Sequence, residues 1–193
     1  MRELIEGVVS PHHFPPPDPV QGGGWQSDAV ARARDVAESL LPPGSKRWRH
    51  SQTAAVAAAE AGLVLDDHEC TLLTSAAWVH DIGYHHPTPA TGFHPIDGAQ
   101  LLLRAGWPSR LASLVAHHSE ARFMADVRGL SAELAVWPRE SGPVADGLVY
   151  ADMTSAPGGG RTGVPDRLAE VRRRHSGEPL VRAVARRRRE PFL

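Results

Sequence analysis

The chain has 193 residues, of which 41% are hydrophobic, and a formal net charge of −1. This size and apolar content suit one domain with one sizeable core. The single cysteine, Cys70, excludes a disulfide within the chain and a zinc site built on paired cysteines. The sequence contains neither an apolar run of about 18 residues nor a basic leader followed by an apolar segment, so we expect a cytoplasmic protein without a membrane span.

The first 27 residues are expected to form a flexible tail. Residues 10–26 contain five prolines and three consecutive glycines, a composition that does not sustain a regular element. A histidine pair lies in this segment, but a flexible tail is a poor platform for metal ligands. We therefore place the folded domain at residues 28–193 and its core at about residues 30–155.

Amphipathic patterns and capping residues predict an all-α fold after the tail. Ser27 or Asp28 begins the first helix, Ser45 caps the second, and a capping box at residues 66–69 begins the third. Pro95 places His94 at the cap of the fourth. Residues 122–140 show no clear pattern. The expected helices span about residues 28–41, 46–61, 66–83, 94–106, 107–118, 142–155, 165–175 and 178–190.

Polar residues interrupt the apolar faces of the second and third helices. His50 shares one face with alanines 54, 57, 58 and 61, so we expect it to point inward. His80 and Asp81 follow the apolar run 72–79 and also point toward the core. Burying a charged group costs several kcal/mol or more unless it is paired or bound to a metal. The His80-Asp81 pair therefore needs a partner.

The fifth helix and the helix at residues 142–155 each add one inward polar residue. Leu111, Leu114, Val115 and His118 follow the i, i+3, i+4, i+7 spacing of a buried stripe. His117 is rotated from that stripe by about 100° and remains the alternative to His118. In the later helix Asp152 shares a stripe with Ala145, Leu148 and Val149. An aspartate is rarely buried without a partner.

The collected inward or cap-placed residues form a set of metal ligands. Imidazole nitrogen and carboxylate oxygen suit divalent iron, manganese, cobalt, nickel or zinc. Six ligands are many for one catalytic ion that keeps a position open, so two ions are the more natural number, with Asp81 able to bridge them. The expected cofactor is thus one or two divalent transition metals. The ligands are His50, His80, Asp81, His94, His118 and Asp152.

The order of these residues resembles the signature of the HD-domain metal-dependent phosphohydrolase superfamily. The segments "RHSQ" at 49–52, "VHDIGY" at 79–84, "FHPIDGA" at 93–99, "AHHSEA" at 116–121 and "YADMT" at 150–154 carry the likeness. The resemblance implies a helical bundle whose central metal is bound by His50, His80, Asp81 and Asp152. His94 and His118 look like the additional histidines of dinuclear members.

The resemblance implies hydrolysis of a phosphate ester or anhydride in a nucleotide-like small molecule. Two metals would make a water molecule reactive near neutral pH, with Asp81, His94 and His118 as the catalytic residues. The alternative is an oxygenase with a mixed-valent diiron pair that cleaves a C–P or C–C bond, because the same ligand order occurs in such enzymes. A scaffold that has lost catalysis is a third possibility, against which the complete ligand set argues.

Several basic residues lie near the ligands in the sequence. We expect the substrate-binding residues among Lys46, Arg47 and Arg49, which precede or flank His50, and Arg122, one turn after His118. The histidines at positions 85 and 86 are either a substrate-facing rim or surface residues. The arginine-rich C-terminus is interpreted as a solvated helix face, so nucleic acid is not an expected partner. Exposed tryptophans at 25 or 107 would support a homodimer.

Overall fold

A computed structural model of the chain describes residues 28–85 and 91–174. Within these residues the protein is helical and contains no strand, which confirms the all-α prediction. The expected tail, His86 and the helix expected at 178–190 lie outside the described residues. The helices are α1 (Ala29–Leu40), α2 (Lys46–Ala61), α3 (Asp67–Val79), α4 (His94–Arg104), α5 (Ser109–His117), α6 (Ala121–Arg128), α7 (Ser131–Ala135), α8 (Pro143–Met153) and α9 (Val164–Arg174).

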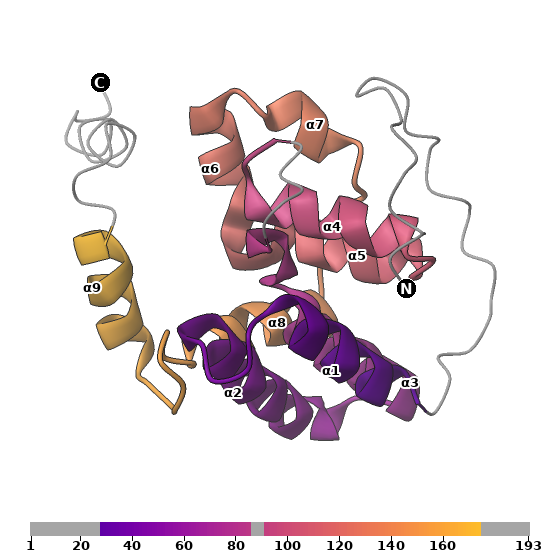
Figure 1. Ribbon diagram of the computed structural model, residues 1–193, viewed down its shortest axis with the longest axis vertical. Coiled ribbons are helices and arrows are strands. Elements are labelled where there is room, and N and C mark those ends of the chain that lie inside the picture. Colours follow the sequence, from indigo (N-terminus) through magenta and orange to yellow (C-terminus); the bar gives the residue numbers. More distant parts are fainter. Residues whose placement is uncertain (1–27, 86–90, 175–193) are drawn as a thin grey trace.

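Helix α3 lies at the centre of the bundle. It packs against α1, α2, α5 and α8. Figure 1 shows the arrangement of the helices. Every residue from Leu72 to Val79 is buried, as expected for an apolar run of small and branched side chains. Helix α2 can approach α3 closely because its buried side chains are small methyl groups. The fully buried alanines of α2 are Ala54, Ala57 and Ala58.

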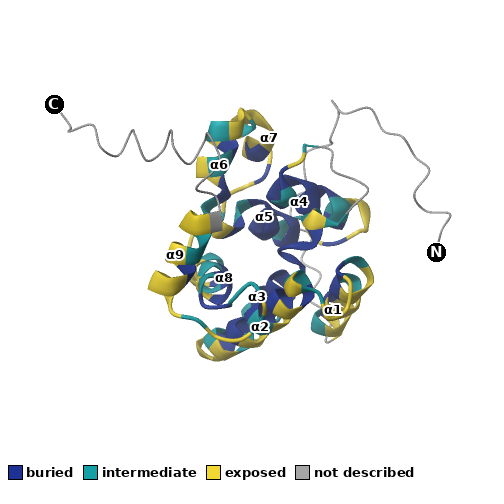
Figure 2. Cartoon of the chain, turned by 60° about the vertical axis from the view of Figure 1, so that its left-hand side comes forward, coloured by how far each residue is buried: buried dark blue, intermediate teal, exposed yellow. Residues whose placement is uncertain are grey.

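The helices farther along the chain complete the fold around this centre. Helices α4 and α5 pack together, and α5 also contacts α3. Helix α8 contacts both α2 and α3, so it brings the end of the chain back to the core. Helix α9 lies at the edge of the bundle and is largely exposed, whereas the interior of the bundle is buried (Figure 2).

Two helices begin at capping residues that the sequence predicts. The Ser45 hydroxyl accepts a hydrogen bond from the Trp48 backbone N–H, and the Asp66 carboxylate accepts one from Glu69. The buried stripe of α1 consists of alanines 29, 33 and 37, whereas Arg34 is exposed. The small alanine side chains allow α1 to lie close against α3.

The third helix ends earlier than expected. Regular α-helix stops at Val79, and Asp81 takes a non-helical conformation with φ −98° and ψ 3° before a short 3-10 turn, Ile82–Tyr84. Gly83 lies against the start of α4: a Cβ there would be 2.0 Å from the His94 carbonyl oxygen. Close packing between this turn and α4 therefore requires glycine at position 83.

Two expectations about individual residues are corrected. His94 is the first residue of α4, and Phe93 occupies the cap position. Trp107 is 5% exposed, so it packs in the core and offers no surface for a dimer; Trp25 lies outside the described residues. None of the described helices has the length and apolar character needed to cross a membrane.

Candidate metal centre

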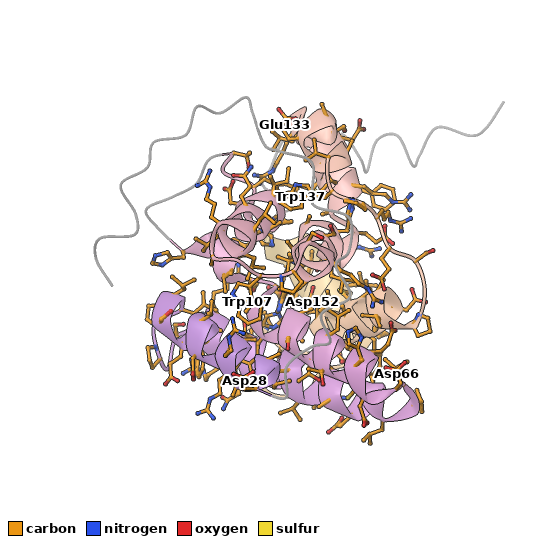
Figure 3. All side chains as sticks on the ribbon, turned by 90° about the vertical axis from the view of Figure 1, so that its right-hand side faces the viewer. Asp28, Asp66, Trp107, Glu133, Trp137 and Asp152 are labelled. Carbon is orange, nitrogen blue, oxygen red and sulfur yellow. The ribbon has the colours of Figure 1, made fainter. Side chains whose placement is uncertain are left out.

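The six expected ligands meet inside the bundle as two neighbouring groups of three. Within each group the donor atoms lie within 4.8 Å of one another. We call the first group triad A, composed of His50, His80 and Asp152, and the second triad B, composed of Asp81, His94 and His118. Figure 3 shows Asp152 in the interior of the bundle, between helices that are distant in sequence. Each triad has a composition and compactness able to hold a metal ion.

Backbone carbonyl groups orient three of the four imidazoles. Nδ1 lies 3.2 Å from the Ala156 carbonyl oxygen in His50, 2.8 Å from that of Ala77 in His80, and 2.6 Å from that of Val115 in His118. A carbonyl oxygen only accepts, so each Nδ1 carries a proton and each Nε2 faces the triad. Metal-binding histidines in proteins are oriented in this way. In His50 the Nε2 also donates to the Asp152 carboxylate; burial alone would lower the pKa of His50, but this hydrogen bond and the charge of Asp81 raise it, so a metal ion at triad A would displace the Nε2 proton.

The carboxylate of Asp81 connects the two triads. Its Oδ1 lies 3.6 Å from His94 Nε2 and 3.9 Å from His118 Nε2 within triad B, and 3.7 Å from His80 Nε2 of triad A. The imidazoles themselves form a contiguous row with ring centroids 5.1–5.2 Å apart, which runs from His50 through His80 and His118 to His94. A carboxylate in this position has donors of both triads around it.

Unsatisfied nitrogen atoms show that these residues fit a metal ion. His80 Nε2 is buried and has no hydrogen-bond partner in the part of the chain that the structure describes, and the Nε2 atoms of His94 and His118 face each other at 3.2 Å. A buried polar atom without a partner costs free energy, and a cation shared by the ring nitrogens would satisfy it. Burial lowers the pKa of His80 and, together with His118, that of His94, so both rings favour the neutral, ligating form.

Asp152 is held on both carboxylate oxygens. His50 Nε2 lies 2.9 Å from Oδ1, Arg167 donates to the same oxygen at 3.5 Å, and the Ser119 hydroxyl donates to Oδ2. Burial alone would raise the pKa of Asp152, but the His50 hydrogen bond and nearby imidazoles lower it well below its usual value. The carboxylate is therefore ionised and fixed in orientation, as a ligand must be.

Ser119 reaches Asp152 through an unusual backbone conformation. It has φ 53° and ψ 30°, and Glu120 also has a positive φ. Non-glycine residues rarely occupy this left-handed region, where they cost of order 1 kcal/mol or more each. This conformation directs the chain away from α5 immediately after His118. It also places the Ser119 hydroxyl next to Oδ2 of Asp152.

Arg47 and Tyr84 cover triad B on its outer side. The guanidinium of Arg47 donates to Asp81 Oδ2 at 2.7 Å and lies over the Tyr84 ring, 3.6 Å from its centroid. Tyr84 in turn stacks on His94 with the centroids 3.9 Å apart. Burial would raise the pKa of Asp81, but His80 and Arg47 lower it below its usual value. This stack fixes the ring of His94, whose side chain is 20% exposed.

A cavity of about 530 Å³ opens onto the two triads. Donors of both triads line it: Asp152 from triad A, and Asp81, His94 and His118 from triad B. His50 and His80 do not line the cavity and are 1% exposed, so triad A lies behind triad B. The volume is typical of a small-molecule site.

Only one of the four expected substrate-binding cations lines this cavity, namely Arg47. Arg49 donates to the carbonyl oxygens of Gly44 and Gly158 and so ties the glycine-rich turn to α2. Arg122 pairs with Glu120 on the surface, and Lys46 is exposed at the start of α2. The structure brings none of these three to the triads.

Other candidate residues are also placed. His117 donates from Nε2 to the Trp137 carbonyl oxygen at 2.9 Å and belongs to neither triad, whereas His118 does. His85 lines the cavity, with Nδ1 hydrogen-bonded to the Leu40 carbonyl oxygen.

Sequence reasoning missed Ser119 and Arg167. Arg167 lies on α9, whose sequence is polar and arginine-rich, yet it is 6% exposed and contacts Asp152. Because the neighbouring residues are charged, the sequence did not indicate that Arg167 is buried. The available signal was its i, i+4 spacing to Val171, since these two residues share the less exposed face of α9. Ser119 gave no such signal, because its role depends on a left-handed turn.

Comparison of the chain with protein-family models, with curated proteins and with solved structures finds no match.

Proposed function

We propose that the protein is a metal-dependent phosphohydrolase of the HD type, with two divalent transition metals held by triads A and B. The observation that carries this proposal is the pair of adjacent His/Asp triads, joined by Asp81, at the end of a cavity of about 530 Å³. Bound divalent metals supply Lewis acidity and lower the pKa of water enough to give a nucleophile near neutral pH. The proposed substrate is a phosphate ester or anhydride of a nucleotide-like small molecule.

The residues of the chain have separate tasks in this reaction. Asp81, placed between the triads, orients the ligand set, and Asp152 stays ionised, so neither carboxylate has to titrate during turnover. Arg47 donates to Asp81, lines the cavity and has further N–H groups for a phosphate oxygen. In the overall reaction a P–O bond breaks, the oxygen of water joins phosphorus, and the leaving oxygen takes up a proton.

The test is a screen of phosphate esters and anhydrides with manganese, cobalt, nickel, iron and magnesium. We expect turnover with at least one metal, and we expect His80→Ala or Asp81→Ala to abolish turnover and metal retention together. Circular dichroism and thermal unfolding check that each variant is folded. Full activity in either purified variant contradicts the proposal.

The same donor types also serve the oxygenase alternative, so the screen includes a second readout. Oxygen uptake with an organic phosphonate or a polyol by the iron-loaded protein, without release of phosphate from any ester, would replace the hydrolase by the mixed-valent diiron oxygenase. Phosphate release without oxygen uptake supports the hydrolase.

A further inference from the structure

The cavity beside the triads has an apolar wall that the proposed chemistry does not use. Of the four α9 residues that line the cavity, two are apolar, Leu168 and Val171, which lie at an i, i+3 spacing and share a face of the helix. The remaining apolar side chains come from the other side of the cavity, at the start of α4, on α6 and at the end of α8; they are Phe93, Met124 and Met153.

A buried cation lies on the same helix, next to the metal ligands. Arg167 is 6% exposed, lines the cavity, and donates to Asp152 and Glu170. Its Nε is buried and has no hydrogen-bond partner among the described residues. A guanidinium N–H without an acceptor costs free energy. Because this Nε is buried, a molecule in the cavity would meet the guanidinium through its other N–H groups, and an anion is the natural partner of that positive charge.

The cavity lining therefore combines two chemically different kinds of side chain. The donors of the triads are accompanied by four cations, namely Arg47, Arg128, Arg167 and Arg172. The apolar side chains of α9 line the same cavity. A hydroxyl-rich body placed against such side chains would lose its hydrogen bonds to water without replacement, whereas a ring or hydrocarbon would gain from burial.

We propose that the cavity selects phosphate esters whose non-phosphate part is a largely apolar ring system. This inference rests on the proposed function, and it names the class of substrate for that same site. The phosphate lies at the triads within reach of Arg167, and the ring lies against Leu168 and Val171. Helix α9 thus determines specificity, although it supplies no metal ligand.

The experiment compares 1-naphthyl phosphate with glycerol 1-phosphate as substrates of the full-length, manganese-loaded protein. We expect kcat/KM to be about tenfold or more higher for the naphthyl ester, since burying several ring carbons is worth at least that factor. Val171→Ser should reduce this ratio by roughly 3- to 10-fold, mainly through KM of the naphthyl ester.

Val164 provides a matched control on the same helix. It is 40% exposed and does not line the cavity, so Val164→Ser makes the same chemical change away from the site. The ratio of the two kcat/KM values should stay at the wild-type value in this variant. Equal kcat/KM for the two esters, or a ratio unaffected by Val171→Ser, overturns the inference and leaves the hydrolase proposal standing.

Binding of 1-naphthyl phosphate, measured by calorimetry on the same manganese-loaded proteins, separates the two proposals. If no ester is hydrolysed but 1-naphthyl phosphate binds and Val171→Ser weakens that binding, the cavity inference holds and the hydrolase proposal fails. Absence of both hydrolysis and binding overturns the inference as well.

Discussion

At the scale of single residues, the centre is defined by which ring nitrogen each histidine presents. Backbone carbonyl groups accept hydrogen bonds from the Nδ1–H groups of His50, His80 and His118, so the three Nε2 atoms face the triads without any rearrangement of the rings. His94 differs, because its ring is positioned by stacking on Tyr84. Preorganised ligands lose little conformational freedom when an ion binds.

The adjacent histidines at the end of α5 allow a direct test of this arrangement. His118→Ala removes a donor of triad B, and we expect loss of one of the two metal ions with little change in folding. His117→Ala removes a half-buried ring whose Nε2 bonds to the Trp137 carbonyl oxygen, so it should retain both ions. Metal content measured by inductively coupled plasma mass spectrometry checks the pair; equal metal loss in the two variants would contradict the assignment.

Sequence periodicity was informative for these residues because their positions follow helical geometry. The stripe of Leu111, Leu114, Val115 and His118 predicted which of two neighbouring histidines points inward, and His118 does lie in triad B. Ser119 could not be found in this way, since its hydroxyl reaches Asp152 only through a left-handed backbone conformation. A pattern of apolar residues that repeats every 3.6 residues carries no information about such a turn.

At the scale of elements, the turn after α3 positions both triads at once. It carries His80 and Asp81, and Gly83 in the same turn lies directly against the first turn of α4, where His94 begins the helix. The sequence placed the end of α3 at Gly83, and the structure places it at Val79. A terminal glycine is a common helix stop, but here the glycine is required for contact with another helix, and one-dimensional patterns do not report that contact.

Gly83→Ala tests this contact. The added Cβ would be 2.0 Å from the His94 carbonyl oxygen and 2.6 Å from the Gly98 nitrogen, so backbone of α4 has to move. We expect a loss of at least about 2–3 kcal/mol in stability and a melting temperature lower by roughly 5–10 °C, with weaker metal binding at triad B. Thermal unfolding with and without manganese measures both effects.

Gly158→Ala is the matched control for this substitution. A Cβ at Gly158 would meet nothing within 4 Å, and its φ is not in the positive range, so we expect little change in melting temperature or metal binding. Equal melting temperatures for Gly83→Ala and the wild-type protein would show that the contact between the turn and α4 has no such role.

At the scale of the whole molecule, the bundle buries one triad behind the other. Helices α2 and α8 and the residue that follows α3 supply triad A, whereas triad B combines Asp81 with the first residue of α4 and the residue that follows α5. Two of the three donors of triad A have no access to the cavity, while every donor of triad B lines it. A substrate in the cavity therefore meets triad B first, and a metal ion in triad A should exchange more slowly.

The most direct test is an anomalous difference map from crystals of the full chain soaked in manganese. The account predicts two peaks in the bundle, one bounded by His50, His80 and Asp152, the other by Asp81, His94 and His118. A map with no peak at either triad, from crystals whose soaking solution contained excess manganese, would contradict it.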